Sequence, residues 1–252
     1  MTRLDDMVKY CDELLRVDEF QDYAPNGLQI EGKPDVSRIV SGVSANLALI
    51  ESAIQHRADA VIVHHGYFWR GEDPRIIAMK KRRIELLMVH GISLLAYHLP
   101  LDAHPEIGNN ASIAEVLGVS TSGNFGSGLQ SGLAMYGELD VATKPEKLSA
   151  LLQDKLSQAP LHLPGRASEI KSIGWCTGAA QDYLFDAAQL GLDAYISGEV
   201  SEQTTHIARE MGIHYFAAGH HATEQFGVRR LADRLSTHFK IDHIPVNIPN
   251  PV

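Results

Sequence analysis

Short apolar segments alternate with longer amphipathic ones along most of the chain. The short segments are rich in β-branched residues and are bounded by glycine, proline or charge, which is typical of strands. We predict strands at Arg38–Ser44, Asp59–His64, Ile92–Leu99, Gly132–Leu139, Ser172–Thr177, Ala194–Ser197, Ile213–Ala218 and His243–Ile248. We predict helices at Leu4–Arg16, Leu47–His56, Pro74–His90, Ala111–Leu117, Pro145–Leu156, Gln181–Leu190, Ser201–Met211 and Ala222–Phe239. Alternating strands and helices indicate an α/β fold with largely parallel sheets.

Two parts of this pattern resemble each other. Ser37–Asp59 aligns without gaps with Lys171–Asp193, and Gly91–Ala96 resembles Gly212–Ala217. Any two strand–helix–strand units share some likeness, but here the matched elements also follow the same order. We therefore expect an internal duplication that gives two similar, interleaved α/β lobes.

The segment Ser120–Gly132 is rich in glycine and serine and poor in apolar residues, so it is our candidate boundary between the lobes. A flexible active-site loop is the alternative interpretation. We expect an N-terminal lobe over residues 1–125, with the first three metal ligands, and a C-terminal lobe over residues 126–252, with the remaining ligands.

Composition narrows the classes of function. The 252 residues are 44% hydrophobic and 21% charged, as in an ordinary globular protein, and the net charge is -9. This acidic balance makes nucleic acid an unlikely partner, and the basic cluster Lys80–Arg83 reads as a solvated helix face. No apolar run is long enough to span a bilayer. Two cysteines, Cys11 and Cys176, do not make a disulfide framework, and the acidic start does not resemble a signal peptide, so we expect a cytoplasmic protein.

Thirteen histidines are unusual, and several follow predicted strands. The strand Ala60–Val63 runs into His64-His65-Gly66, and the strand that begins at Ile92 is followed by His98 and Asp102. Ligand sites of parallel α/β sheets lie at the carboxyl ends of strands. Histidine is the commonest metal ligand, and a carboxylate has two oxygens that can bridge two ions. Surface histidines and a capping aspartate are the alternatives.

The later motif Gly219-His220-His221-Ala222-Thr223-Glu224 follows another strand. His220 and Glu224 are four residues apart, so a helix that begins near them brings both side chains together. The alternative for Glu224 is a carboxylate favoured by the helix dipole. In the duplication, His64-His65 corresponds to Gly198-Glu199, so polar residues gather at equivalent strand ends of both lobes. We expect one dinuclear metal site shared between the lobes.

The sequence resembles the Nif-three-like family of dinuclear-metal proteins, whose members are labelled GTP cyclohydrolase type 2 homologs. The matching segments span nearly the whole chain: Asn26–Gly32, His64–Gly66, Leu101-Asp102, Ser197–Glu199, Gly219–Glu224 and Ile248–Pro251. The resemblance implies that the metal ligands are His64, His65, Asp102, His220 and Glu224, the residues that the strand-end argument also reaches. It further implies a ring-shaped homohexamer.

The donors are nitrogen and carboxylate without thiolate, which suits two divalent ions per subunit and leaves Zn, Fe, Mn and Co as alternatives. We expect a metal-dependent hydrolase that uses a metal-bridged hydroxide and acts on a nucleotide, as GTP cyclohydrolase does, or on a related heterocycle. Glu199 is our candidate general base, and support of a neighbouring ligand is its alternative role. A non-catalytic metal-binding scaffold or a regulatory ring protein is the competing function.

Overall fold

The computed structural model describes residues 1–127 and 132–252 and divides them into two compact units. The first unit comprises Met1–Gly108 and Gln225–Ile248, and the second comprises Asn109–Glu224 and Pro249–Val252. The expected division at residues 125 and 126 differs from this one, because residues 109–125 belong to the second unit and Gln225–Ile248 returns to the first. Within residues 1–127 and 132–252, no helix has both the length and the apolar character needed to cross a membrane.

The first unit is built on a five-stranded sheet with the order β13-β4-β5-β6-β2. Neighbouring strands from β13 to β6 are parallel, and β2 is antiparallel to β6. The strands of this sheet are β2 (Gly27–Ile30), β4 (Arg38–Ser44), β5 (Ala60–His65), β6 (Ser93–Ala96) and β13 (Asp242–Pro245). A separate antiparallel pair is formed by β1 (Thr2–Arg3) and β3 (Asp35–Val36). The helices are α1 (Leu4–Leu15), η1 (Val17–Glu19), α2 (Leu47–Gln55), α3 (Ala78–His90), α4 (Leu99–Ala103) and most of α9 (His220–Phe239).

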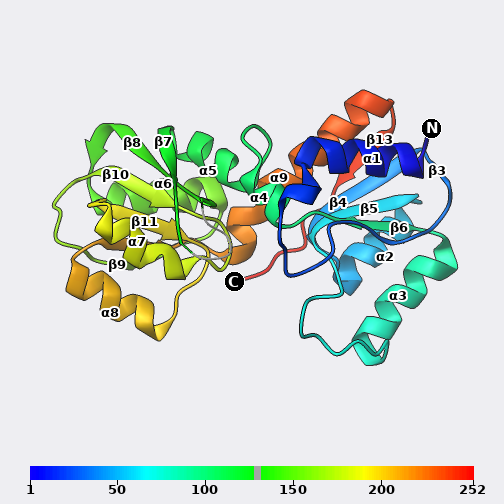
Figure 1. Cartoon of the computed structure of the whole chain (residues 1–252), viewed down its shortest axis with the longest axis horizontal. Coiled ribbons are helices and arrows are strands. Elements are labelled where there is room, and N and C mark those ends of the chain that lie inside the picture. The colour runs from blue at the N-terminus through cyan, green and yellow to red at the C-terminus, as the bar shows by residue number, and fades with distance from the viewer. Residues whose placement is uncertain (128–131) are drawn as a thin grey trace. The chain divides into compact units, whose positions relative to one another are not determined.

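Alternate residues of the central strands face two separate apolar layers, as the pleat of a strand requires. Ile39 and Ile62 pack with apolar residues of α1 and α9, whereas their neighbours Val40 and Val61 pack with those of α2 and α3. Figure 1 shows β4, β5 and β6 between these two pairs of helices. A sheet that is buried on both faces explains why its strands are continuous apolar runs rather than alternating ones.

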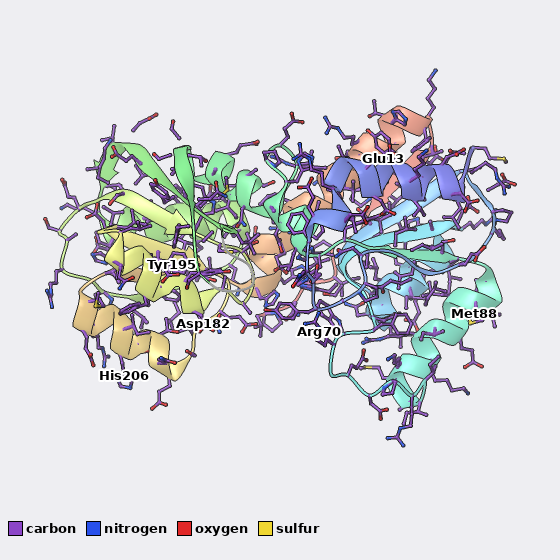
Figure 2. The ribbon with its side chains drawn as sticks, viewed as in Figure 1. Glu13, Arg70, Met88, Asp182, Tyr195 and His206 are labelled. Atoms are coloured by element: carbon purple, nitrogen blue, oxygen red, sulfur yellow. The ribbon has the colours of Figure 1, made fainter. Side chains whose placement is uncertain are left out.

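The described part of the second unit forms a six-stranded sheet with the order β7-β8-β10-β11-β12-β9. Here β10, β11 and β12 are parallel, and β7, β8 and β9 run antiparallel to their neighbours. The strands are β7 (Val119–Phe125), β8 (Ala134–Thr143), β9 (Leu161–Leu163), β10 (Ile170–Trp175), β11 (Ala194–Ser197) and β12 (His214–Ala217). The helices are α5 (Asn109–Leu117), α6 (Pro145–Leu156), η2 (Gln181–Tyr183), α7 (Leu184–Gln189) and α8 (Glu202–Met211). Figure 2 shows Tyr195 of β11 inside this unit and His206 projecting from α8.

The strand registers of the two units match the aligned repeats. Ile39 pairs with Ala60 in the first unit, and the aligned Ile173 pairs with Ala194 in the second. One carboxylate recurs as well: Asp59 accepts hydrogen bonds from the backbone N–H groups of Ser37 and Arg38, and Asp193 accepts them from those of Lys171 and Ser172. The two units therefore share one β–α–β–α–β core.

The structure gives a reason for two of the differences from the predicted pattern. The helix predicted from Pro74 begins at Ala78, because Asp73 accepts a hydrogen bond from the backbone of Arg75 and holds this segment in a turn. The candidate boundary Ser120–Gly132 begins inside strand β7, whose serines and threonine are exposed at the edge of the sheet. Residues 128–131 of that segment lie outside the described residues.

Candidate metal centre

Three histidines of the first unit lie close together at the carboxyl ends of β5 and β6. Each of His64, His65 and His98 offers one ring nitrogen, and these atoms lie within 4.8 Å of one another. His64 is fully buried, and its Nε2 lies 3.4 Å from Oδ1 of Asp102, which is 5% exposed in the first turns of α4. The first unit thus brings together all three of its predicted ligands, with His98 beside them.

Hydrogen bonds orient the imidazoles. His64 Nδ1 lies 2.8 Å from the carbonyl oxygen of Tyr97, and a carbonyl only accepts, so Nδ1 carries the proton. A neutral His64 therefore presents the lone pair of Nε2 on the side of Asp102. His65 Nδ1 lies 3.2 Å from the hydroxyl of Ser44. Hydrogen bonds at Nδ1 that fix the ring for binding at Nε2 are typical of metal-binding histidines.

His98 is held by Asp22, a residue that the sequence analysis did not single out. His98 Nδ1 donates to Asp22 Oδ1 at 2.7 Å, and the Asp22 side chain is 3% exposed. Burial alone raises the pKa of Asp22, but hydrogen bonding and the charge of His98, followed by bonds from Asn26 and Leu99, outweigh it and lower the pKa to about 2. Asp22 is therefore an ionised partner that fixes the imidazole.

The Asn26–Gly32 motif supports this group of side chains. Asn26 donates to Asp22 and accepts a hydrogen bond from the backbone of His98. Gln29 accepts one from the backbone of Tyr67, and its Oε1 occupies the space that a Cβ on Gly66 would need. The glycine of His64-His65-Gly66 is thus required by close packing.

In the second unit, His220 lies between two carboxylates. Its Nδ1 donates to Glu199 Oε1 at 2.7 Å, and its Nε2 lies 3.1 Å from Glu224 Oε2. Glu224 is 3% exposed, and α9 begins at His220, so both side chains come from its first turns, as their spacing predicts. The predicted residues Glu199, His220 and Glu224 therefore form one group within this unit.

The pKa of His220 reflects these neighbours. Burial alone lowers it, but the hydrogen bond and charge of Glu224, and then those of Glu199, outweigh burial and raise it to about 9. A metal ion that binds Nε2 must therefore displace a proton at neutral pH. Glycine at position 198 allows the backbone to approach this group closely. A Cβ on Gly198 would lie 2.6 Å from Cα of His220 and 2.7 Å from the carbonyl oxygen of Gly178.

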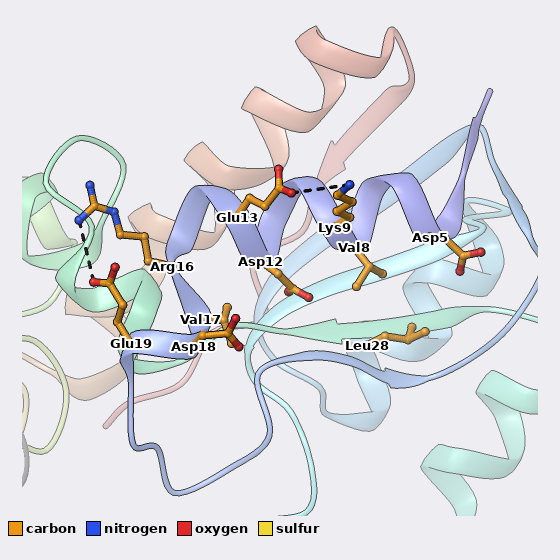
Figure 3. Close-up of a pocket in the computed structure, with 10 residues that line it drawn as sticks. All are labelled: Asp5, Val8, Lys9, Asp12, Glu13, Arg16, Val17, Asp18, Glu19 and Leu28. Carbon is orange, nitrogen blue, oxygen red and sulfur yellow. Dashed lines mark ion pairs between the residues drawn. The ribbon is translucent and has the colours of Figure 1, made fainter.

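A groove of about 490 Å³ in the first unit is lined by a different set of residues, mostly from α1 and η1 (Figure 3). Its carboxylates include Asp12, which accepts a hydrogen bond from the hydroxyl of Tyr97 at 2.9 Å. The same tyrosine holds His64 through its carbonyl oxygen. Asp12 therefore helps to position Tyr97. The residues that line the groove include none of the predicted ligands.

Comparison with known proteins identifies the family. The model of the family described as Duf34/NIF3 (NGG1p interacting factor 3) matches residues 2–251. This chain belongs to the Duf34/NIF3 family. A relative from Pseudomonas aeruginosa named GTP cyclohydrolase 1 type 2 homolog is 48% identical over 248 residues, with 98% of each chain covered. A relative of the same name from Escherichia coli is 45% identical over 247 residues, again with 98% of each covered.

Solved structures of similar proteins share the Duf34/NIF3 fold. The protein ybgI, described as of unknown function, has a TM-score of 0.96 at 44% identity, with complete coverage of both chains. TTHA1606 from Thermus thermophilus has a TM-score of 0.89 at 31% identity, also with complete coverage. The resemblance inferred from the sequence motifs is confirmed.

Proposed function

We propose that this Duf34/NIF3 protein binds two divalent metal ions through His64, His65, Asp102, His220 and Glu224 and acts as a metal-dependent hydrolase. The observation that carries the proposal is the arrangement of the imidazoles. His64 and His220 each use Nδ1 in a hydrogen bond and keep Nε2 beside a buried carboxylate. Ligands from both units are proposed to serve the same pair of ions, as the family resemblance implies.

The donor set fits such ions. Imidazole nitrogen and carboxylate oxygen suit Zn²⁺, Mn²⁺, Fe²⁺ and Co²⁺ alike. Bound ions of this kind supply Lewis-acid stabilisation of negative charge and lower the pKa of a coordinated water molecule. The chain itself supplies buried carboxylates and oriented imidazoles at fixed positions, which limits the reorganisation that binding requires.

Glu199 has two candidate roles in this proposal. Its contact with Nδ1 of His220 favours a positioning role, in which the carboxylate orients the imidazole. General-base catalysis, the role predicted from the sequence, requires that the carboxylate reach a water molecule or substrate. The two roles differ in what Glu199→Gln should change, as discussed below.

The names of the relatives suggest GTP, or a related heterocycle, as the first substrate class to test. We also propose a homohexamer, on the family resemblance, and a reducing compartment such as the cytoplasm, because two cysteines do not make a disulfide framework. A non-catalytic metal-binding scaffold or regulatory ring is the alternative function. Light scattering that finds a monomer at micromolar concentration would exclude the hexamer.

The test removes ligands of the second unit one at a time. His220→Ala and Glu224→Ala should each lower the metal content of reconstituted protein while circular dichroism shows a folded chain. His206→Ala is the matched control, because its side chain is exposed and its ion pair with Glu202 is long, at 4.0 Å. Wild-type protein should hold close to two ions per chain by elemental analysis. Full metal occupancy in both ligand variants would contradict the shared site.

Activity needs its own measurement. Loaded and metal-stripped protein should be incubated with GTP and with a panel of related amides and phosphate esters. Metal-dependent product formation would support the hydrolase. Stable metal binding with no turnover of any of these compounds would favour the scaffold.

A further inference from the structure

His98 lies among the candidate ligands of the first unit but is outside the ligand set proposed above. Its ring centroid is 5.0 Å from that of His64 and 5.8 Å from that of His65. The three residues also form a group whose ring nitrogens lie within 4.8 Å of one another. All three belong to one compact unit, so their arrangement is fixed by that unit alone.

His98 and its partner Asp22 form more hydrogen bonds than a turn in the chain requires. The ring donates to Asp22, and the backbone N–H of the same residue donates to Asn26 Oδ1 at 2.7 Å. Asp22 also accepts hydrogen bonds from Asn26 Nδ2 at 2.8 Å and from the backbone of Leu99 at 3.0 Å. Both the ring and the backbone of His98 are thereby fixed. Trp69 packs edge-on against the ring, with centroids 5.0 Å apart.

The three imidazoles share one pattern. Nδ1 is bonded to Tyr97 in His64, to Ser44 in His65 and to Asp22 in His98. Because Nδ1 is engaged in each ring, Nε2 is the nitrogen that would coordinate a metal ion. In many metal sites a ligating histidine donates its other ring N–H to a carboxylate, as His98 donates to Asp22, and the carboxylate orients the ring and increases its basicity.

We propose that His98 is a metal ligand, and that His64, His65 and His98 allow the first unit to hold one divalent ion with its own residues. Three protein ligands with a water molecule at the fourth position are a common arrangement for a tetrahedral ion. The inference rests on the proposed metal binding and adds the order in which the two ions bind. One ion binds to the first unit, and the second ion requires His220 and Glu224.

The test separates this inference from the proposed function. Metal content and affinity should be measured with Zn²⁺ and Co²⁺ in a His220→Ala/Glu224→Ala double variant of the full chain. The double variant should keep one ion per chain, and its Co²⁺ absorption should indicate histidine ligands. Addition of His98→Ala should weaken the binding of that ion by more than roughly 100-fold, beyond the loss typical of a residue that only supports a ligand. His206→Ala in the same background is the control.

His98→Gln provides a second variant if alanine disturbs folding, because its amide can still donate to Asp22. Loss of all metal from the double variant would overturn the inference, since the first unit would not hold an ion alone. Equal affinity with and without His98 would also overturn it. Wild-type protein that binds one ion, lost on His98→Ala, would support the inference and contradict the two-ion function.

Discussion

The two units share one β–α–β–α–β core but place their candidate ligands at different positions of it. The strand registers equate His64 with Gly198, and His98 with Gly219. By the same registers, Leu99 corresponds to His220. Where one unit has an imidazole, the other has a glycine or an apolar residue. Duplication has therefore preserved the scaffold while the donors diverged, and His65 is the candidate ligand that corresponds to another candidate site residue, Glu199.

The difference has a structural cause in the second unit. His220 lies at the start of a long helix, and its backbone passes so close to Gly198 that no side chain fits there. In the first unit, the buried imidazole of His64 occupies the equivalent position. The close backbone contacts of Gly198 therefore exclude a side-chain donor at that position of the second unit.

The largest effect should come from the cysteines, which report on each unit separately. Cys11 lies in the first unit and Cys176 in the second, and both are buried. Burial raises the pKa of Cys11 to about 12, although a hydrogen bond with Tyr97 opposes this effect. Labelling of either thiol at pH 8 should be slower than in urea by a factor on the order of 1,000 or more, because it requires local opening. Cys11→Ala and Cys176→Ala each leave one reporter, and labelling at the unfolded rate would contradict the burial of that cysteine.

Gly198→Ala tests the close approach that distinguishes the second unit. The added Cβ would meet backbone atoms of His220 and Gly178 on two sides. Overpacking of this kind costs about 1–3 kcal/mol, so the urea midpoint should fall and metal content should fall with it. An unchanged midpoint would mean that the backbone moves freely there, and the steric reason for the divergence would be lost.

Asp22→Asn and Glu199→Gln are matched changes in the two units, since each removes the charge of a carboxylate that holds an imidazole. Each should weaken metal binding by roughly 10–100-fold in a competition assay with a chromophoric chelator. If Glu199 is instead the general base, Glu199→Gln should lower kcat at full metal occupancy. Unchanged affinity in either variant would remove the positioning role of that carboxylate.

The smallest effect concerns His162 on the edge strand β9. His214 donates from Nε2 to the carbonyl oxygen of Ala167, so its Nδ1 accepts the hydrogen bond from His162 Nε2. Burial, followed by the charge of His214, lowers the pKa of His162 below 6.5. The unfolded chain therefore takes up a proton first, and stability should decline as the pH falls below about 6.5. The melting temperature of His162→Gln should decline less between pH 8 and pH 5, and equal slopes would contradict this role.

The sequence predicts the parallel core well because its strands are buried on both faces. Arg38–Ser44 and Ala194–Ser197 are found with the predicted bounds, and the aligned repeats pair in equivalent registers. The exposed strand β7 and the three-residue strand β9 were missed. An edge strand need not be apolar, and a three-residue strand is too short to show an alternating pattern of apolar and polar residues. Tertiary pairing, rather than local pattern, makes these segments strands.

For the candidate site, strand-end position predicts His64, Asp102 and His220 as ligands, and the structure places each of them beside another candidate donor. Their binding of metal stays a prediction. Asp22 could not be found in the same way. It lies outside every predicted element and reaches His98 only because the chain folds back, so no periodicity or spacing connects the two. Asn26 belongs to the Asn26–Gly32 motif noted in the sequence, but the motif does not reveal which atoms the Asn26 side chain contacts.

The return of the chain to the first unit affects how the protein folds while it is being synthesised. Helix α9 supplies Val228, Leu231 and Leu235 to the core of that unit, and β13 pairs with β4 across most of the sequence. A ribosome synthesises these residues after those of the second unit, so the first unit is completed only after the second unit has been translated. Until then, one edge of β4 and the apolar face opposite α9 lack their native cover. The nascent chain should therefore need a chaperone, or rapid completion, more than its size suggests.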